Sequence, residues 1–182
     1  MAAPSEITVR NLSGRWNSNS ELSDDVTPLM ELQGVPWIVR SMLSRASISV
    51  TLTQSIDAET GVSRVDSSQT SMGQVVEEAR VLDWEPRDQS HLIFGNMTVR
   101  SRFSAPNDVE AALRDRSGSG EPDWDGEVIE IEVRTVGWTS ITVWGFTIID
   151  GTRRYIRRTI ARKGEEEKII QLVYDWAGPN ES

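Results

Sequence analysis

The chain has 182 residues, of which 37% are hydrophobic and 26% are charged, and its formal net charge is −9. These values predict a single globular domain over residues 1–182, and the negative charge argues against a nucleic-acid partner because it would repel a phosphate backbone. With no cysteine and a single histidine, His91, the chain lacks the residues for a disulfide framework or a multi-histidine metal cluster, and we predict neither a metal nor another cofactor.

The first predicted strand begins with a Gly-x-Trp motif, Gly14 to Trp16. Glycine allows two backbones to approach closely, and the large ring that follows can plug one end of a closed sheet. The motif is short, so it supports a barrel only together with the rest of the chain.

Residues 25–44 predict two short helices that form a lid. Asp24 or Asp25 can cap the first helix, and Gly34 is suited to the left-handed position that ends it. In the second helix the apolar positions are Trp37, Ile38, Met42 and Leu43, with Arg40 and Arg45 on the exposed side.

Alternating polar and apolar residues then predict a series of strands without a helix between them. The expected strands cover residues 46–56, 62–72, 75–84 and 91–103, with a loop at 85–88 and a bend at Gly95. Residues 104–126 interrupt the series with a helical stretch at 107–116 and a loop rich in Gly, Ser, Pro and Asp. Strand structure resumes at 128–135.

The last part of the chain predicts three consecutive strands, residues 137–150, 152–163 and 167–176. Asp150-Gly151 joins the first two, and Asp-Gly between alternating runs is a strong hairpin signal. Residues 177–182 are expected to form a frayed tail. The whole pattern predicts a mainly β fold, an antiparallel up-and-down barrel of about nine or ten strands with a helical lid and one insertion, because closing so large a sheet removes its edges.

The order of strand, helix-turn-helix and long meander resembles the intracellular fatty-acid-binding proteins, within the wider calycin group that includes the lipocalins. The local similarity covers about residues 12–45, with Leu32 to Trp37 comparable to the family's turn between the two lid helices. The chain also resembles fungal stand-alone calycin-like proteins, which include carriers and cofactor-free enzymes of secondary metabolism. It implies a barrel that binds a lipophilic small molecule.

Two features depart from that family. The chain carries additional residues, most clearly at 104–126. The family binds a fatty carboxylate through an Arg-x-Tyr pair on its last strand, whereas this chain has Gln171 and Leu172 before Tyr174 there, and Tyr155-x-Arg157 one strand earlier. An ordinary fatty acid is therefore not the expected ligand.

Aromatic residues on neighbouring strands are the best candidates for a ligand site, because small-molecule sites are mostly apolar with few polar groups. The alternative is that these rings simply fill the barrel. The predicted ligand-binding residues are Trp37, Met42, Trp138, Trp144, Phe146, Tyr155, Arg157 and Tyr174; no catalytic residue is assigned.

Arg157 shares a strand face with Tyr155, and two interpretations are open. If that face points inward, the guanidinium needs a carboxylate or an anionic ligand. If it points outward, Arg157 would pair with Glu130 or Glu132 across strands. His91 is expected at a solvated rim, and Arg64 with Asp66 is expected to be a surface pair.

Two functions are compatible with this sequence. The favoured one is an intracellular carrier of a lipophilic small molecule; the alternative is a cofactor-independent isomerase or cyclase, of the pericyclase type, that uses the same cavity. A packed barrel acting as a protein-interaction module is a third possibility. The amino-terminal residues lack a signal-peptide pattern and no run could span a bilayer, so the cytoplasm is the expected location. The sequence predicts no oligomeric state.

Overall fold

A computed structural model describes residues 1–44 and 46–181. Two sequence predictions concern residues outside this range. They are the exposed position of Arg45 and the inclusion of Ser182 in a frayed tail. In the described part of the chain, no helix is long and apolar enough to cross a membrane.

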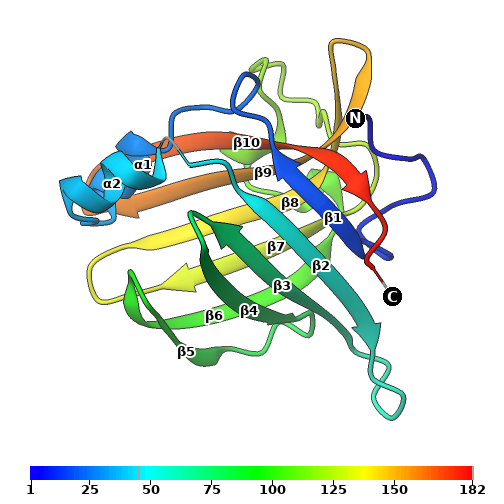
Figure 1. The fold of residues 1–182 in the computed structure, drawn as a ribbon, viewed down its shortest axis with the longest axis horizontal. Helices are drawn as coiled ribbons and strands as arrows, with labels where there is room; N and C mark the ends of the chain where they lie inside the picture. The colour runs from blue at the N-terminus through cyan, green and yellow to red at the C-terminus, as the bar shows by residue number, and fades with distance from the viewer. Residues whose placement is uncertain (45, 182) are drawn as a thin grey trace.

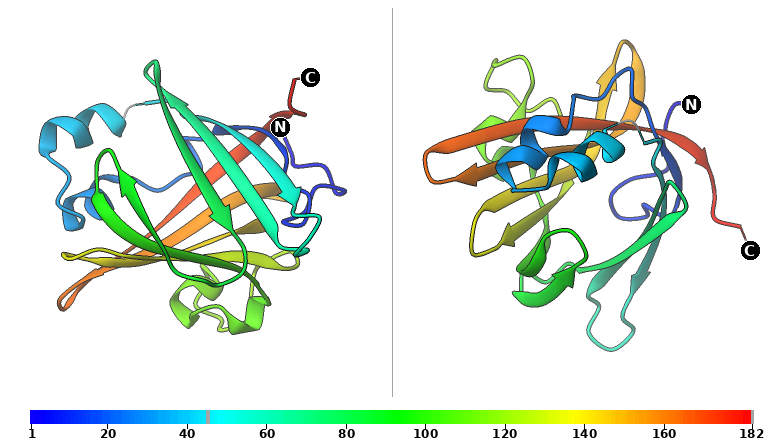
Figure 2. Two further views of the ribbon diagram at one scale, coloured as in Figure 1. Left: turned by 90° about the horizontal axis from the view of Figure 1, so that it is seen from below. Right: turned by 60° about the vertical axis from the view of Figure 1, so that its left-hand side comes forward.

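In the described part of the chain, ten antiparallel strands form one sheet that curls around a common interior (Figures 1 and 2). The strands are β1 (Gly14–Ser18), β2 (Ser49–Ile56), β3 (Ser63–Ser71), β4 (Gln74–Val81), β5 (Arg87–His91), β6 (Gly95–Ser104), β7 (Val128–Arg134), β8 (Thr139–Ile149), β9 (Thr152–Lys163) and β10 (Glu166–Gly178). They lie in the order β4-β3-β2-β1-β10-β9-β8-β7-β6-β5. The predicted mainly β, up-and-down barrel is confirmed.

The barrel departs from a fully closed ladder at one place, which we call the β4–β5 seam. β4 and β5 are the two ends of the hydrogen-bonded order in the described chain. Side chains bridge them instead: Arg80 Nη1 donates to Gln89 Oε1 at 3.1 Å, and Gln89 Nε2 donates to the Ala79 carbonyl at 3.3 Å. The expectation of complete closure is therefore wrong at this seam, where polar side chains replace the backbone ladder.

The strand predicted over residues 91–103 is in fact part of a hairpin, β5 and β6, and Arg87 and Asp88 belong to β5 rather than to a loop. Leu92 to Phe94 is an apolar run that reads as strand, but it forms the turn. Gly95 has a φ of +70°, which ends the turn in a conformation that favours glycine.

Two short helices, α1 (Thr27–Leu32) and α2 (Trp37–Leu43), lie at one end of the barrel, at the left in Figure 1. The Thr27 backbone N–H donates to Asp25 Oδ1 at 2.9 Å, and Gly34 has a φ of +77°. Leu29 and Leu32 of α1 are buried against Trp138, Ala161 and Ile170, so α1 covers this end of the interior. α2 contributes no buried residue.

The inserted segment packs on the outside of the barrel. It contains a 3-10 helix (Pro106–Asp108) and a four-residue helix, α3 (Ala111–Arg114), so the predicted helix at 107–116 is much shorter than expected. Trp124 of the following loop is buried, and a Cβ built on Gly145 of β8 would lie 2.8 Å from its ring. The outer wall formed by β8, β9 and β10 is therefore covered.

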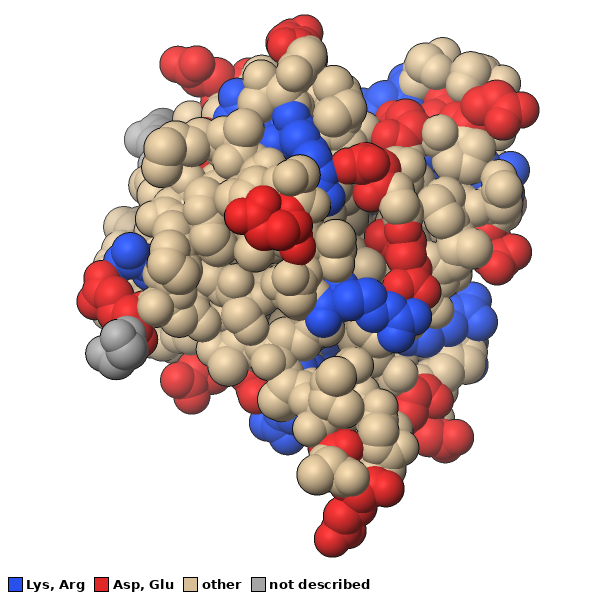
Figure 3. All heavy atoms as spheres, turned by 90° about the vertical axis from the view of Figure 1, so that its right-hand side faces the viewer, with Lys and Arg blue, Asp and Glu red and all other residues tan. Residues whose placement is uncertain are grey.

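The carboxyl-terminal residues are held against the barrel. β10 continues to Gly178, and Asn180 Nδ2 donates to the Leu52 carbonyl at 2.9 Å. The frayed tail expected from residue 177 is wrong for the described part, because β10 extends into it and the Asn180 side chain donates to the sheet. Figure 3 views the molecule from this end, where basic and acidic side chains lie next to each other. Two ion pairs near this end are Arg10–Glu127 and Arg15–Glu181.

The Gly-x-Trp motif acts as expected. Trp16 is fully buried, and Gly14, with a φ of +151°, lies against the ring of Trp176, 2.1 Å from where a Cβ would be. We expect Gly14→Ala to lower the free energy of unfolding by about 1–3 kcal/mol, because the ring must move to make room. Urea unfolding of both proteins tests this. Gly137→Ala is the matched control, since a Cβ there meets no atom within 4 Å; an equal effect of both changes would contradict the packing argument.

Candidate functional site

Five of the eight predicted ligand-binding residues face the interior and meet there. Alternation along β8, β9 and β10 directs one set of side chains inward, and all five are more than nine-tenths buried. They are Trp144 and Phe146 of β8, Tyr155 and Arg157 of β9, and Tyr174 of β10. The sequence pattern therefore identified a real cluster, formed by three adjacent strands.

The rings of this cluster pack against each other on one side of Arg157. The centroid of the Tyr155 ring lies 4.9 Å from that of Trp16, 5.7 Å from Phe146 and 5.4 Å from Tyr174. Such separations are typical of tilted aromatic contacts in protein cores. These rings make one half of the interior rigid and apolar.

The Arg157 guanidinium crosses from β9 toward β3. Its Nε donates to the Tyr155 hydroxyl oxygen at 3.0 Å, and its Nη1 donates to Gln69 Oε1 at 3.4 Å. Its central carbon lies 4.1 Å from the centroid of the Trp144 ring and 5.0 Å from that of Tyr174. The inward interpretation of Arg157 is thus confirmed, and the outward one is wrong.

The carboxylates proposed for the outward interpretation have other partners. Glu130 accepts from Arg102 and Glu132 from Arg100, both on the outer face. Alternation places Arg158, the next residue on β9, outside, where it pairs with Asp123 of the insertion.

Arg157 has no carboxylate within 4 Å among the described residues, and its Nη2 is buried without a hydrogen-bond partner. Burial acts to lower the pKa of Arg157, but the oxygens of Tyr155 and Tyr174 act to raise it, and the net shift is upward. The side chain is therefore a buried cation with N–H groups left to donate.

A second polar group lies along the β4–β5 seam. Glu78 Oε2 is 2.9 Å from Arg80 Nη2, and Glu78 Oε1 is 3.9 Å from His91 Nε2. Glu78 also acts on Arg157 through its charge. Neither Glu78 nor Arg80 was predicted as a site residue, because β4 and β9 are far apart in the sheet order and meet only across the interior.

The prediction that His91 lies at a solvated rim is wrong. Its side chain is 13% exposed and stacks on Phe94 with 4.8 Å between ring centroids. Its Nδ1 accepts the backbone N–H of Ile93 at 3.1 Å, so Nε2 carries the proton in the neutral ring. Burial lowers the pKa of His91. His91 lies on the same face of β5 as Gln89, whose side chain crosses the β4–β5 seam.

The other three predicted residues lie nearer the lid. Trp138 is buried beneath α1, and its ring centroid is 5.3 Å from that of Phe94. Trp37 and Met42 of α2 are exposed, at 69% and 50%. The structure does not bring these three to Arg157; a ligand contact through them stays a prediction.

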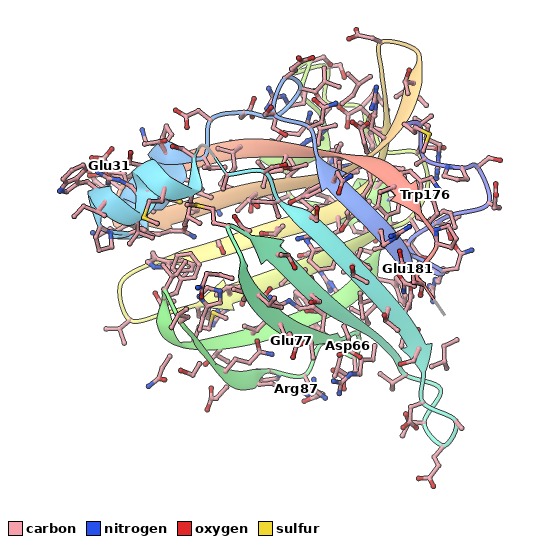
Figure 4. All side chains as sticks on the ribbon, viewed as in Figure 1. Glu31, Asp66, Glu77, Arg87, Trp176 and Glu181 are labelled. Carbon is pink, nitrogen blue, oxygen red and sulfur yellow. The ribbon has the colours of Figure 1, made fainter. Side chains whose placement is uncertain are left out.

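Two hollows lie away from Arg157. One, of about 410 Å³, is on the outer face of β2, β3 and β4, and its lining includes Asp66 and Glu77, both labelled in Figure 4. Asp66 pairs there with Arg64 at 2.7 Å, as the predicted surface pair. The other, of about 230 Å³, lies between the amino-terminal segment and residues 125–127.

No family model matches the chain. Two curated relatives align over nearly the full length. A protein described as a probable pericyclase, scpY, of Mollisia scopiformis is 31% identical over 189 residues, covering 98% of this chain and 96% of the relative. The pericyclase pydY of an Acremonium species is 30% identical over 183 residues, covering 98% of both chains.

Solved structures with the same fold are much more distant in sequence. A Schistosoma mansoni fatty-acid-binding protein in complex with arachidonic acid is 16% identical, with a TM-score of 0.57 over 91% of this chain and 96% of that one. The fluorescent protein UnaG is 11% identical, with a TM-score of 0.59 over 91% and 97%. These similarities confirm the calycin-like fold and carry no further statement about activity.

Proposed function

Because the chain belongs to the pericyclase family, we propose that it catalyses a cofactor-independent pericyclic ring closure of a lipophilic polyene inside the barrel. The observation that carries the proposal is the buried Arg157 guanidinium, which has a free Nη2 and is surrounded by aromatic rings. In such a reaction π electrons are redistributed into new carbon–carbon σ bonds. The product is an isomer of the substrate, and no atom, electron or cofactor is consumed.

The aromatic wall supplies the first part of the catalysis. A flexible polyene must bring two distant carbon atoms together, which costs conformational entropy in solution. Contact with Trp144, Tyr155 and Tyr174 would hold a folded conformer with the reacting carbons close together, which lowers the barrier. The same wall determines which face of the polyene reacts.

Arg157 supplies the second part. A hydrogen bond from its Nη2 to a carbonyl oxygen conjugated with the reacting π system withdraws electron density and favours bond formation. Rings within about 4–5 Å shield this hydrogen bond from water, which strengthens it. Tyr155 and Gln69 hold the guanidinium in place through Nε and Nη1.

A synthetic linear probe tests the proposal: a conjugated diene tethered to an α,β-unsaturated ketone. We expect the protein to convert it to cyclic isomers of unchanged mass, faster than buffer does and with a different ratio of stereoisomers. Chiral chromatography with mass detection measures both. Heat-denatured protein is the control for nonspecific apolar surface. A probe that binds the native protein but cyclises at the buffer rate and isomer ratio would instead indicate the carrier function.

A further inference from the structure

The charge inside the barrel is not balanced by the protein. Of the arginines that the structure describes, three are at least nine-tenths buried, and two of these have a carboxylate partner: Arg80 pairs with Glu78 at 2.9 Å, and Arg158 with Asp123 at 2.9 Å. Arg157, the third, has none within 4 Å among the described residues. A buried cation without a counter-ion is costly, and proteins usually provide one.

Neighbouring groups do not neutralise Arg157. Burial raises the pKa of Tyr155 to about 12, so this phenol is uncharged at neutral pH. Glu78 is close enough to act on Arg157, but its charge is already matched by Arg80. His91 is neutral or positive at every pH, so it adds no negative charge. Arg157, Arg80 and Glu78 together leave one positive charge in the interior of a chain with a net charge of −9.

Hydrogen-bond donors lie close together next to the Arg157 guanidinium. Among the described residues, no group accepts a hydrogen bond from Arg157 Nη2. The Tyr155 oxygen accepts from Arg157 Nε, which leaves the hydroxyl hydrogen of Tyr155 to donate nearby. A buried group of donors around an uncompensated cation is the arrangement expected for binding an anionic oxygen.

We propose that the substrate carries an anionic oxygen head group when bound, a carboxylate or the enolate of an acidic 1,3-dicarbonyl, with the anionic oxygen on Arg157 Nη2 and its polyene chain along the aromatic wall. This inference rests on the proposed function for the polyene part and adds the class of the head group. The binding position is on β9, facing Gln69 of β3, and not on the last strand, where Leu172 and Tyr174 lie.

Equilibrium binding tests the head group without turnover. The probes are two matched pairs: cis-parinaric acid with its methyl ester, and a 2-acyl-1,3-dione bearing the same polyene chain with its enol methyl ether. Binding is measured by quenching of tryptophan fluorescence, since Trp144 lies next to Arg157. We expect at least one anion to bind about 10- to 100-fold tighter than its neutral partner, as a charge-assisted hydrogen bond provides. The pair with the larger ratio identifies the head group.

Two variants assign the preference to Arg157. Arg157→Met should reduce the ratio of acid to ester affinities to about one while ester binding persists, and Arg158→Met, at the adjacent outward position, should keep the ratio of the wild type. Equal affinities within both pairs, absence of binding by both anions, or an unchanged ratio in Arg157→Met would overturn the inference. An anion preference without ring closure would refute the proposed function alone. Cyclisation of the neutral ketone probe without any anion preference would refute the head group alone.

Discussion

Replacement of Arg157 by methionine is expected to lower the rate of ring closure by about 10²- to 10³-fold, the loss typical when one oxyanion-stabilising donor is removed. The same change should leave the free energy of unfolding unchanged or raise it by about 1–4 kcal/mol, because an apolar side chain replaces a buried charge with no carboxylate partner. The measurements are kcat with the linear ketone probe and urea unfolding of both proteins.

This combination separates a functional residue from a structural one. A core side chain that merely fills space loses stability when it is altered, and its effect on activity follows from unfolding. Arg157→Lys is an informative second variant, because it keeps the positive charge but loses the planar fork that contacts Tyr155 and Gln69. Activity of Arg157→Met equal to wild type would refute the proposed role. A large loss of stability would show that Arg157 is a packing residue.

Replacement of Asp123 by asparagine is expected to have the opposite effect, a loss of about 3 kcal/mol in the free energy of unfolding with activity per folded molecule retained. Arg158 is 1% exposed and donates to both Asp123 carboxylate oxygens, at 2.9 and 3.0 Å, so the substitution leaves a buried charge without its partner. The expected loss of stability is at the lower end of the range for breaking a buried ion pair, because the Asp123 side chain is 34% exposed. Urea unfolding, with kcat measured well below the transition, tests both parts.

A double variant provides the control for this prediction. Arg158→Met combined with Asp123→Asn removes both charges, so it should recover part of the lost stability relative to Asp123→Asn alone. If the double variant is less stable than the single one, the pair contributes through packing against Trp124, whose ring lies 4.5 Å from the Arg158 guanidinium, and not through charge.

The two neighbouring arginines explain why local pattern identified part of the site. Alternation along β9 placed Arg157 and Arg158 on opposite faces, and aromatic residues of matching parity on β8 and β10 placed Arg157 on the face that carries the rings. This assignment of side chains to faces depends only on relations between sequence neighbours and between adjacent strands. The pattern alone left the inward and outward interpretations of Arg157 open, since glutamates for an outward pairing were also available on β7.

The polar partners of the site could not be predicted in the same way. Gln69 and Glu78 lie on β3 and β4, which are separated from β9 by several strands in the sheet order and approach it only because the sheet curls. Position along a strand gives no information about the facing wall, because that contact depends on twist and curvature accumulated over the whole sheet. The position of His91 was missed for a local reason, because Leu92 to Phe94 forms the turn of the β5–β6 hairpin although its apolar residues indicate a strand.

The sequence by itself determined most of the strands, the Asp150-Gly151 hairpin, the position of the lid and the fact that aromatic residues of β8, β9 and β10 share one face. Each of these depends on alternation, backbone conformation or turn chemistry within a few residues, such as the positive φ angles of Asp150 and Gly151. Only the tertiary structure decided that Arg157 lies inside without a counter-ion while Arg158 pairs with Asp123. The reason is that a charge is balanced by groups brought near it in space, and these come from β3, β4 and the insertion.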